Sequence, residues 1–126
     1  MQHIIKFLLE SPEAAIRYQT HLYLLDADPS SEEMLRLQDE IRTDPRSQLL
    51  LSERTPEGII PRRPYNKWLG THWVLAMLAD LHYPSGDTAL QPMVEQELEM
   101  ILNIPVRTIA GKNRNCASIT ANALWS

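Results

Sequence analysis

Glycine and cysteine are both scarce in this sequence, and each shortage excludes a class of site. Its 126 residues include 4 glycines and 1 cysteine. There is neither a G-x-G-x-x-G run nor a P-loop, the glycine-rich segments that bind nucleotide phosphates. The lone cysteine, Cys116, excludes an internal disulfide and a multi-cysteine zinc site. We therefore expect no metal, no cofactor and a cytoplasmic location.

Long apolar runs and a strong charge of one sign are also missing. The apolar run Ile4–Leu9 includes Lys6 and is far shorter than the roughly 20 residues that span a bilayer. The formal net charge is −4, which creates no field that attracts nucleic acid. The sequence predicts no membrane span and no nucleic-acid partner.

Signals for helix ends recur along the whole chain. Ser11-Pro12-Glu13 opens a helix, Ser30 and Glu33 form a capping box, and Asp44-Pro45 restarts a short helix. Thr71 caps a further helix, and Asp87 or Thr88 caps the next. The expected helices are therefore 1–10 packed on the core, 11–25, 30–43, a short one from 44, 71–83 and 87–103, to within a few residues.

The apolar faces of these helices alternate between broad and narrow. Helix 71–83 is apolar nearly all round, whereas helix 30–43 has a narrow stripe of Met34, Leu37 and Ile41. Helix 87–103 has a second such stripe, with its wet side opposite; the stripe comprises Leu90, Val94, Leu98 and Ile101, and the wet side Glu95, Gln96 and Glu99. The alternation is typical of inner and outer helices in a two-layer array. It predicts an all-α fold of paired helices.

The end of the chain is expected to be another inner helix, Cys116–Ser126, without its outer partner. We therefore expect one helical domain over 1–126 that is the N-terminal part of a longer protein. Its expected partners are the missing C-terminal helices or an apolar small molecule. Exposed apolar surface would also favour a homo-oligomer.

The motifs around the longest connection, Thr55–Leu69, resemble a known superfamily. Pro56-Glu57-Gly58, followed by Lys67-Trp68-Leu69-Gly70-Thr71 at the start of an apolar helix, is similar to the α/α toroids. That superfamily includes squalene–hopene and other terpene cyclases, protein prenyltransferases, and bacterial proteins with a prenyltransferase/squalene-oxidase-type repeat. The resemblance covers about Leu49–Leu102 and implies a partial α/α toroid. An open HEAT-like α-solenoid is the alternative.

The catalytic motifs of that superfamily are not matched here. Ser52 and Ile60 stand near the positions of the repeat glutamine and tryptophan, and Asp26-Ala27-Asp28-Pro29 lacks the last acid of the cyclase proton donor. Cys116 has no acid just upstream, as the prenyltransferase zinc site requires. The resemblance implies a fold, and we assign no catalytic residue.

Candidate ligand-binding residues gather at the junction between the long connection and helix 71–83. Aromatic rings there would line an apolar pocket or would pack as core; they are Tyr65, Trp68, His72 and Trp73. Arg62, Arg63 and Lys67 would hold a diphosphate or a carboxylate, or would be solvated. Three functions stay open: a non-catalytic toroid-type module with an apolar concave face, part of an enzyme acting on isoprenoid substrates, and a helical-repeat module that binds proteins.

Overall fold

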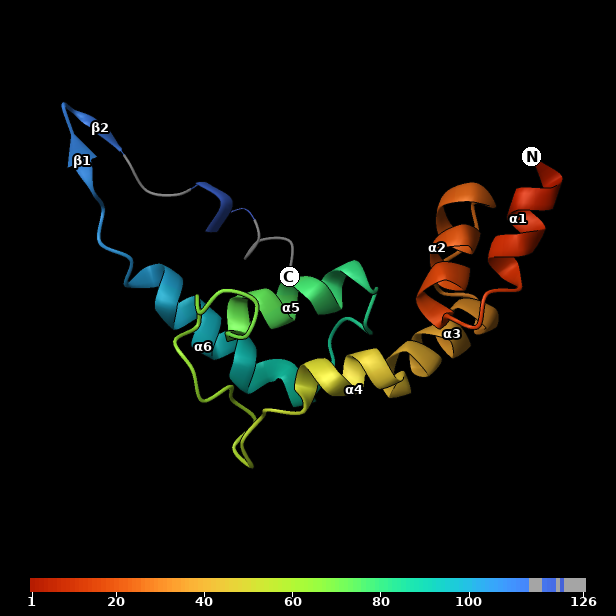
Figure 1. Ribbon diagram of the computed structural model, residues 1–126, viewed down its shortest axis with the longest axis horizontal. Helices are drawn as coiled ribbons and strands as arrows, with labels where there is room; N and C mark the ends of the chain where they lie inside the picture. The colour runs from red at the N-terminus through yellow and green to blue at the C-terminus, as the bar shows by residue number, and fades with distance from the viewer. Residues whose placement is uncertain (114–116, 120, 122–126) are drawn as a thin grey trace. The chain divides into compact units, whose positions relative to one another are not determined.

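The capping residues and prolines of the sequence divide the chain into short helices. The structure, a computed structural model, describes residues 1–113, 117–119 and 121. Its elements (Figure 1) are α1 Gln2–Leu9, α2 Ala14–Leu24, α3 Glu32–Thr43, α4 Pro45–Leu51, α5 Thr71–Asp80, the 3-10 helix η1 Thr88–Leu90, α6 Gln91–Leu102, β1 Thr108–Ile109 and β2 Lys112–Asn113. Regular structure in the described residues is almost entirely helical, which confirms the all-α class.

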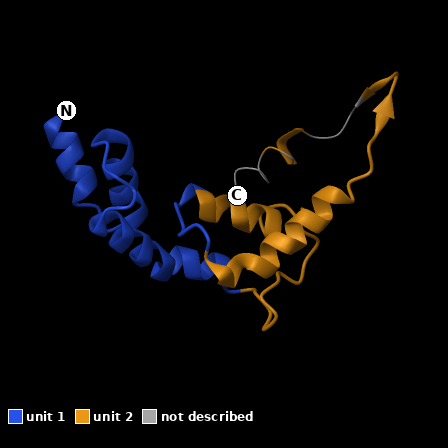
Figure 2. Cartoon of the chain, turned by 180° about the vertical axis from the view of Figure 1, so that it is seen from behind, with its two compact units in different colours: residues 1–52, 80–86 blue, residues 53–79, 87–126 orange. Residues whose placement is uncertain are grey.

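The chain comprises two compact units (Figure 2). Unit 1 contains residues 1–52 and 80–86, and unit 2 contains residues 53–79 and 87–126. The segment 80–86, which connects α5 to η1, therefore belongs to unit 1 although the helices on either side of it belong to unit 2. The toroid, the solenoid and the single domain over 1–126 stay predictions.

Unit 1 has an apolar core between α2 and α3. Met34 and Leu37 are fully buried and Ile41 is 1% exposed, which confirms the predicted stripe. These three pack with Ala14, Ala15 and Tyr18 of α2. Helix α1 packs against α2, one of the two core helices, but contributes no fully buried residue to the core.

Several helix ends differ from the prediction by one or two residues. Helix α2 begins after Glu13, and the Ser11 hydroxyl accepts a hydrogen bond from the Glu13 amide instead of capping the helix. The cap of α3 is Ser31, not Ser30, because Ser30 bonds to Asp28 in the preceding turn. Asp44 caps α4 as predicted.

Unit 2 is formed around α5, α6 and the connection that precedes α5. Fully or nearly fully buried apolar residues are contributed by all three; they are Ile60, Val74, Leu75, Leu78 and Met93. Gly58, at φ 85°, lies against Pro92 of α6, and a Cβ there would come within 3.0 Å of the proline ring. The close approach explains why glycine occupies this turn.

Helix α6 buries a different face from the one predicted. Of the predicted stripe, Val94 and Leu98 are 40% and 51% exposed, and Leu90 and Ile101 are only partly buried. The buried residues of α6 are Met93 and Glu97, and Gln96 is partly buried. The apolar stripe was therefore a wrong prediction for this helix, because acceptors on Glu97 and Gln96 find donors on α5.

The polar stretch after α6 forms a two-stranded antiparallel hairpin that the sequence did not predict. Thr108 pairs with Asn113 and Ile109 with Lys112. Ala110 and Gly111 at the turn both have positive φ, 51° and 73°, as a tight hairpin turn requires. Beyond it, residues 117–119 and 121 are helical. Most of the helix predicted from Cys116 lies outside the described residues.

Candidate functional site

The junction between the connection and α5 is a tightly wound loop. The amides of Asn66 and Leu69 donate to the carbonyls of Arg63 and Asn66, and the Gly70 amide also donates to Asn66, at 2.7 Å. The His72 amide donates to the Pro64 carbonyl at 3.1 Å. A Cβ on Gly70 would lie 2.2 Å from that carbonyl oxygen, so only glycine fits there. These bonds hold residues 63–70 against the start of α5.

The four predicted residues Tyr65, Trp68, His72 and Trp73, which we call the aromatic cluster, lie together. The ring centroids of Trp68 and Trp73 are 4.6 Å apart. Those of Tyr65 lie 5.0 Å from His72 and 5.5 Å from Trp73, and His72 and Trp73 are 5.1 Å apart at right angles. Tilted and edge-to-face contacts at these distances are favourable for aromatic pairs.

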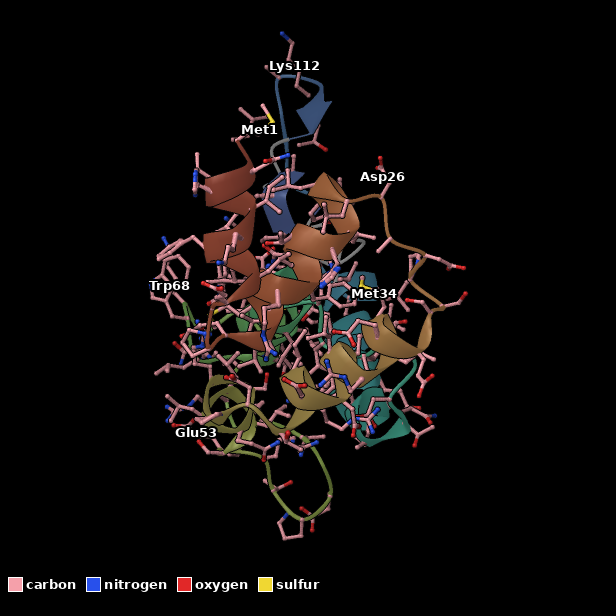
Figure 3. The ribbon with its side chains drawn as sticks, turned by 90° about the vertical axis from the view of Figure 1, so that its right-hand side faces the viewer. Met1, Asp26, Met34, Glu53, Trp68 and Lys112 are labelled. Atoms are coloured by element: carbon pink, nitrogen blue, oxygen red, sulfur yellow. The ribbon has the colours of Figure 1, made fainter. Side chains whose placement is uncertain are left out.

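Members of the cluster differ in how far they reach the surface. Trp68, labelled in Figure 3, is 59% exposed, whereas His72 is 1% exposed. Tyr65 and Trp73 are intermediate, and Leu69 beside them is 48% exposed. Trp68 also has a left-handed backbone, φ 69°, which an aromatic residue rarely adopts. The surface of the cluster is therefore Trp68 and Leu69, with Tyr65 and Trp73 behind them.

His72, the most deeply buried member of the cluster, is paired with Glu97 of α6. The His72 Nδ1 donates to Glu97 Oε1 at 2.6 Å, and the side chains are 1% and 3% exposed. For His72 Nε2 and Glu97 Oε2 the described part of the chain offers no hydrogen-bond partner. A pair this deep joins α5 to α6 and does not face solvent.

One residue earlier on each helix, a second polar contact links α5 to α6. Thr71 lies inside α5 and does not cap it, and its hydroxyl donates to Gln96 Oε1. The Gln96 amide nitrogen donates to the Ile60 carbonyl at 2.9 Å, and the Ile60 amide donates to Gln96 Oε1 at 3.4 Å. Gln96 thus connects both helices with the connection. We call Thr71, His72, Gln96 and Glu97 the polar ladder.

The two predicted arginines have different surroundings. Arg62 forms two hydrogen bonds with the Glu53 carboxylate, at 2.6 and 2.9 Å. That contact holds the pKa of Glu53 below its usual value. Arg63 is exposed, and Lys67 lies over the Trp68 ring at 5.4 Å. Lys67 is therefore a cation in contact with the aromatic cluster, and Arg63 is an exposed cation of the same loop.

Sequence reasoning found the aromatic cluster but missed Glu97 and Gln96. Gln96 was predicted to lie on the solvent-exposed side of its helix, and no prediction was made for Glu97. A signal was present, because Met93, Glu97 and Met100 recur at helical spacing and so share a face. A carboxylate between two methionines indicates a buried acid that needs a partner.

The described residues show neither a metal site nor a membrane-spanning helix. No set of three or more His, Cys, Asp or Glu side chains among them is placed to hold a metal ion. None of the described helices is long and apolar enough to cross a membrane.

No protein-family model matches the chain, and no curated protein or solved structure is significantly similar to it.

Proposed function

We propose that this chain is a non-catalytic helical module of the toroid type that binds an apolar small molecule at the aromatic cluster. The observation that carries the proposal is Trp68, a large aromatic side chain that is 59% exposed on a tightly bonded loop. Its left-handed backbone, φ 69°, is costly for a bulky residue and persists only where the surrounding structure holds it. Such strain is concentrated at binding and catalytic sites.

The rest of the cluster supports the same role. Trp73 contacts the Trp68 ring and is itself in contact with Tyr65, and the polar ladder fixes the start of α5, where Trp73 lies. A binding surface of this kind is prearranged, so little conformational entropy is lost when a ligand docks. Aromatic surface with a few polar groups at its edge is the usual composition of small-molecule sites.

The cations of this loop indicate that the ligand also carries an anionic group. Lys67 lies over the exposed Trp68 ring, Arg63 is an exposed cation of the same loop, and Arg62 is already neutralised by Glu53. An apolar molecule with one anionic group would place its chain on Trp68 and its charge near Arg63 and Lys67. The proposed ligand is therefore an apolar monoanion.

The test is calorimetric titration with decanol and with decanoate, below micelle-forming concentrations. Full burial of the exposed part of Trp68, about 120 Å², is worth at most about 3 kcal/mol at 25 cal/mol per Å². We expect Trp68→Ala to weaken binding of both ligands by roughly 10- to 100-fold. Leu102→Ala removes a more exposed apolar side chain from the same unit and should change neither.

The proposed role of the cations is tested by comparing the binding of decanoate with that of decanol. Arg63→Gln should weaken decanoate and leave decanol unchanged. Arg42→Gln, in unit 1, changes the net charge equally and should affect neither. Equal binding by the wild-type protein and Trp68→Ala would contradict the proposed site.

A second candidate function, self-association as a helical interaction module, is favoured by the apolar face of unit 1. Ile4 and Phe7 of α1 are 63% and 75% exposed, and Leu24 of α2 is 53% exposed. Sedimentation velocity of the wild-type protein and of Phe7→Ser tests this candidate. A concentration-dependent dimer that Phe7→Ser abolishes would support it, and a monomer at all concentrations would remove it.

A further inference from the structure

Residues 80–86, which we call the strap, attach to unit 1 mainly through side chains. Leu81 and Tyr83 are partly buried against the core of α2 and α3. The Asp80 carbonyl accepts a hydrogen bond from the Gln19 side chain at 2.9 Å. Pro84 is buried. A segment held by a few side-chain contacts opens more easily than a helix or a sheet strand does.

His82 is the centre of this attachment because its ring lies against two tyrosines of α2. Its centroid is 5.1 Å from that of Tyr18 and 5.7 Å from that of Tyr23. The Tyr23 hydroxyl and His82 Nε2 are 3.3 Å apart, within hydrogen-bond distance. Tyr18 is 4% exposed, so one side of the imidazole meets the apolar core.

The backbone at His82 also depends on these contacts. His82 has φ 57°, in the left-handed region that residues other than glycine enter rarely. A residue stays there only where its neighbours hold it. Loss of the ring contacts would therefore also release the strained backbone, and the strap would open as a unit.

Partial burial of the His82 ring disfavours a charged imidazole. Tyr18 and Tyr23 are the titratable groups of α2 in contact with it, and Asp80 is the charged group of the strap. Burial lowers the pKa of His82, and Asp80 opposes that change only in part. Burial, with a smaller contribution from Tyr23, raises the pKa of Tyr18, so no tyrosinate is available near neutral pH to pair with an imidazolium.

We propose that the strap is a pH-sensitive clasp, closed on α2 while His82 is neutral and opened when His82 takes up a proton. An opened strap returns the imidazolium to water, where its charge is solvated. The contacts with Tyr18 and Tyr23 stabilise the closed form only while the His82 ring lies against α2. The clasp is independent of the ligand proposed for unit 2, because none of its residues belongs to the aromatic cluster.

The direction of the pH effect follows from linkage. His82 binds a proton more weakly in the closed strap than in the open one, so acid favours the open form. The stabilisation of the closed strap is complete above the value of a free histidine, about 6.5, and is lost as the pH falls below it. The clasp therefore responds in mildly acidic solution, the range in which histidine is the usual switch.

The experiment combines NMR titration of the His82 ring with hydrogen exchange of the strap amides. Exchange is measured at about pH 7.5 and about pH 5, and each rate is divided by the intrinsic rate at that pH. We expect strap protection to fall several-fold at the lower pH, while the amides of Leu37 and Ile41 in α3 keep theirs. The ring should titrate below about 6.5.

His82→Asn is the decisive variant, because asparagine tolerates a left-handed backbone and cannot be protonated. In His82→Asn, protection of the strap amides should change between the two pH values by no more than protection of the α3 amides changes in the wild-type protein. His3→Asn removes an exposed histidine of α1 and should behave as the wild-type protein does. An equal fall of strap protection in His82→Asn, or a ring that titrates at or above 6.5, would overturn the proposal. The ring titration decides the question in the wild-type protein even if His82→Asn does not fold.

Discussion

Both units of this chain have an apolar core, but only in unit 2 is a buried pair of ionisable side chains added to the contact between two helices. In unit 1, the buried contact of α2 with α3 consists of methionine, leucine, isoleucine, alanine and tyrosine, and the ion pair between Arg17 and Glu40 lies at its partly exposed edge. In unit 2, α5 and α6 meet through the polar ladder, with His72 and Glu97 1% and 3% exposed. Apolar contacts tolerate adjustment, whereas paired polar groups accept one geometry. We infer that the ladder provides the geometric constraint that the aromatic cluster requires.

The largest expected effect comes from removing one partner of the buried pair. Glu97→Leu leaves His72 buried without its acceptor, and breaking a buried pair in this way costs about 3 to 5 kcal/mol. Leu37→Ala is the matched change in unit 1, where an apolar cavity costs about 2 to 5 kcal/mol. Amide exchange resolved by residue measures each loss in its own unit. Loss of protection in α5 and α6 by less than tenfold for Glu97→Leu would contradict the importance of the pair.

The difference between the units also explains what the sequence could and could not predict. The stripe of Met34, Leu37 and Ile41 was predictable because an apolar core obeys helical periodicity alone. The spacing of Met93, Glu97 and Met100 indicated the buried face of α6, but the partner of Glu97 was not predictable, because His72 lies 25 residues away. Periodicity contains no information about such a partner.

The candidate site was only partly predictable for a related reason. The aromatic cluster was found because its members are close in sequence, at the start of one helix. Their roles were not, since the exposure of Trp68 and the burial of His72 depend on how the loop winds around Gly70. That winding is set by backbone hydrogen bonds that residue types do not specify.

An intermediate effect is expected from the second contact of the ladder. Gln96→Leu removes the acceptor of the Thr71 hydroxyl and the partner of both Ile60 backbone groups. An unsatisfied buried polar group costs about 1 to 3 kcal/mol, less than an unpaired charge. Chemical denaturation followed by the near-ultraviolet signal of Trp68 and Trp73 measures the change. Gln91→Leu, on an exposed turn of the same helix, is the control and should be neutral.

The smallest effect is expected at the surface of unit 1, where charges pair in water. Arg36 bonds to Glu33 at 2.8 Å, and this bond lowers the pKa of Glu33. A lowered pKa contributes stability above the unfolded value, and this is lost as the pH falls through the folded one. Because both side chains are exposed, Arg36→Gln should leave protection of α3 nearly unchanged at pH 7. A clear loss of protection there would mean that unit 1 also depends on charge pairing.

The measurement that most directly tests the contrast between the units is a double-mutant cycle on His72 and Glu97. Free energies of unfolding are determined for the wild-type protein, His72→Leu, Glu97→Leu and the double variant. If His72 and Glu97 are coupled, each single change is costly and the double variant recovers most of the loss, because neither side chain then remains buried without its partner. If the two losses simply add, His72 and Glu97 act independently, and the account of unit 2 as a helix pair held by a polar ladder is wrong.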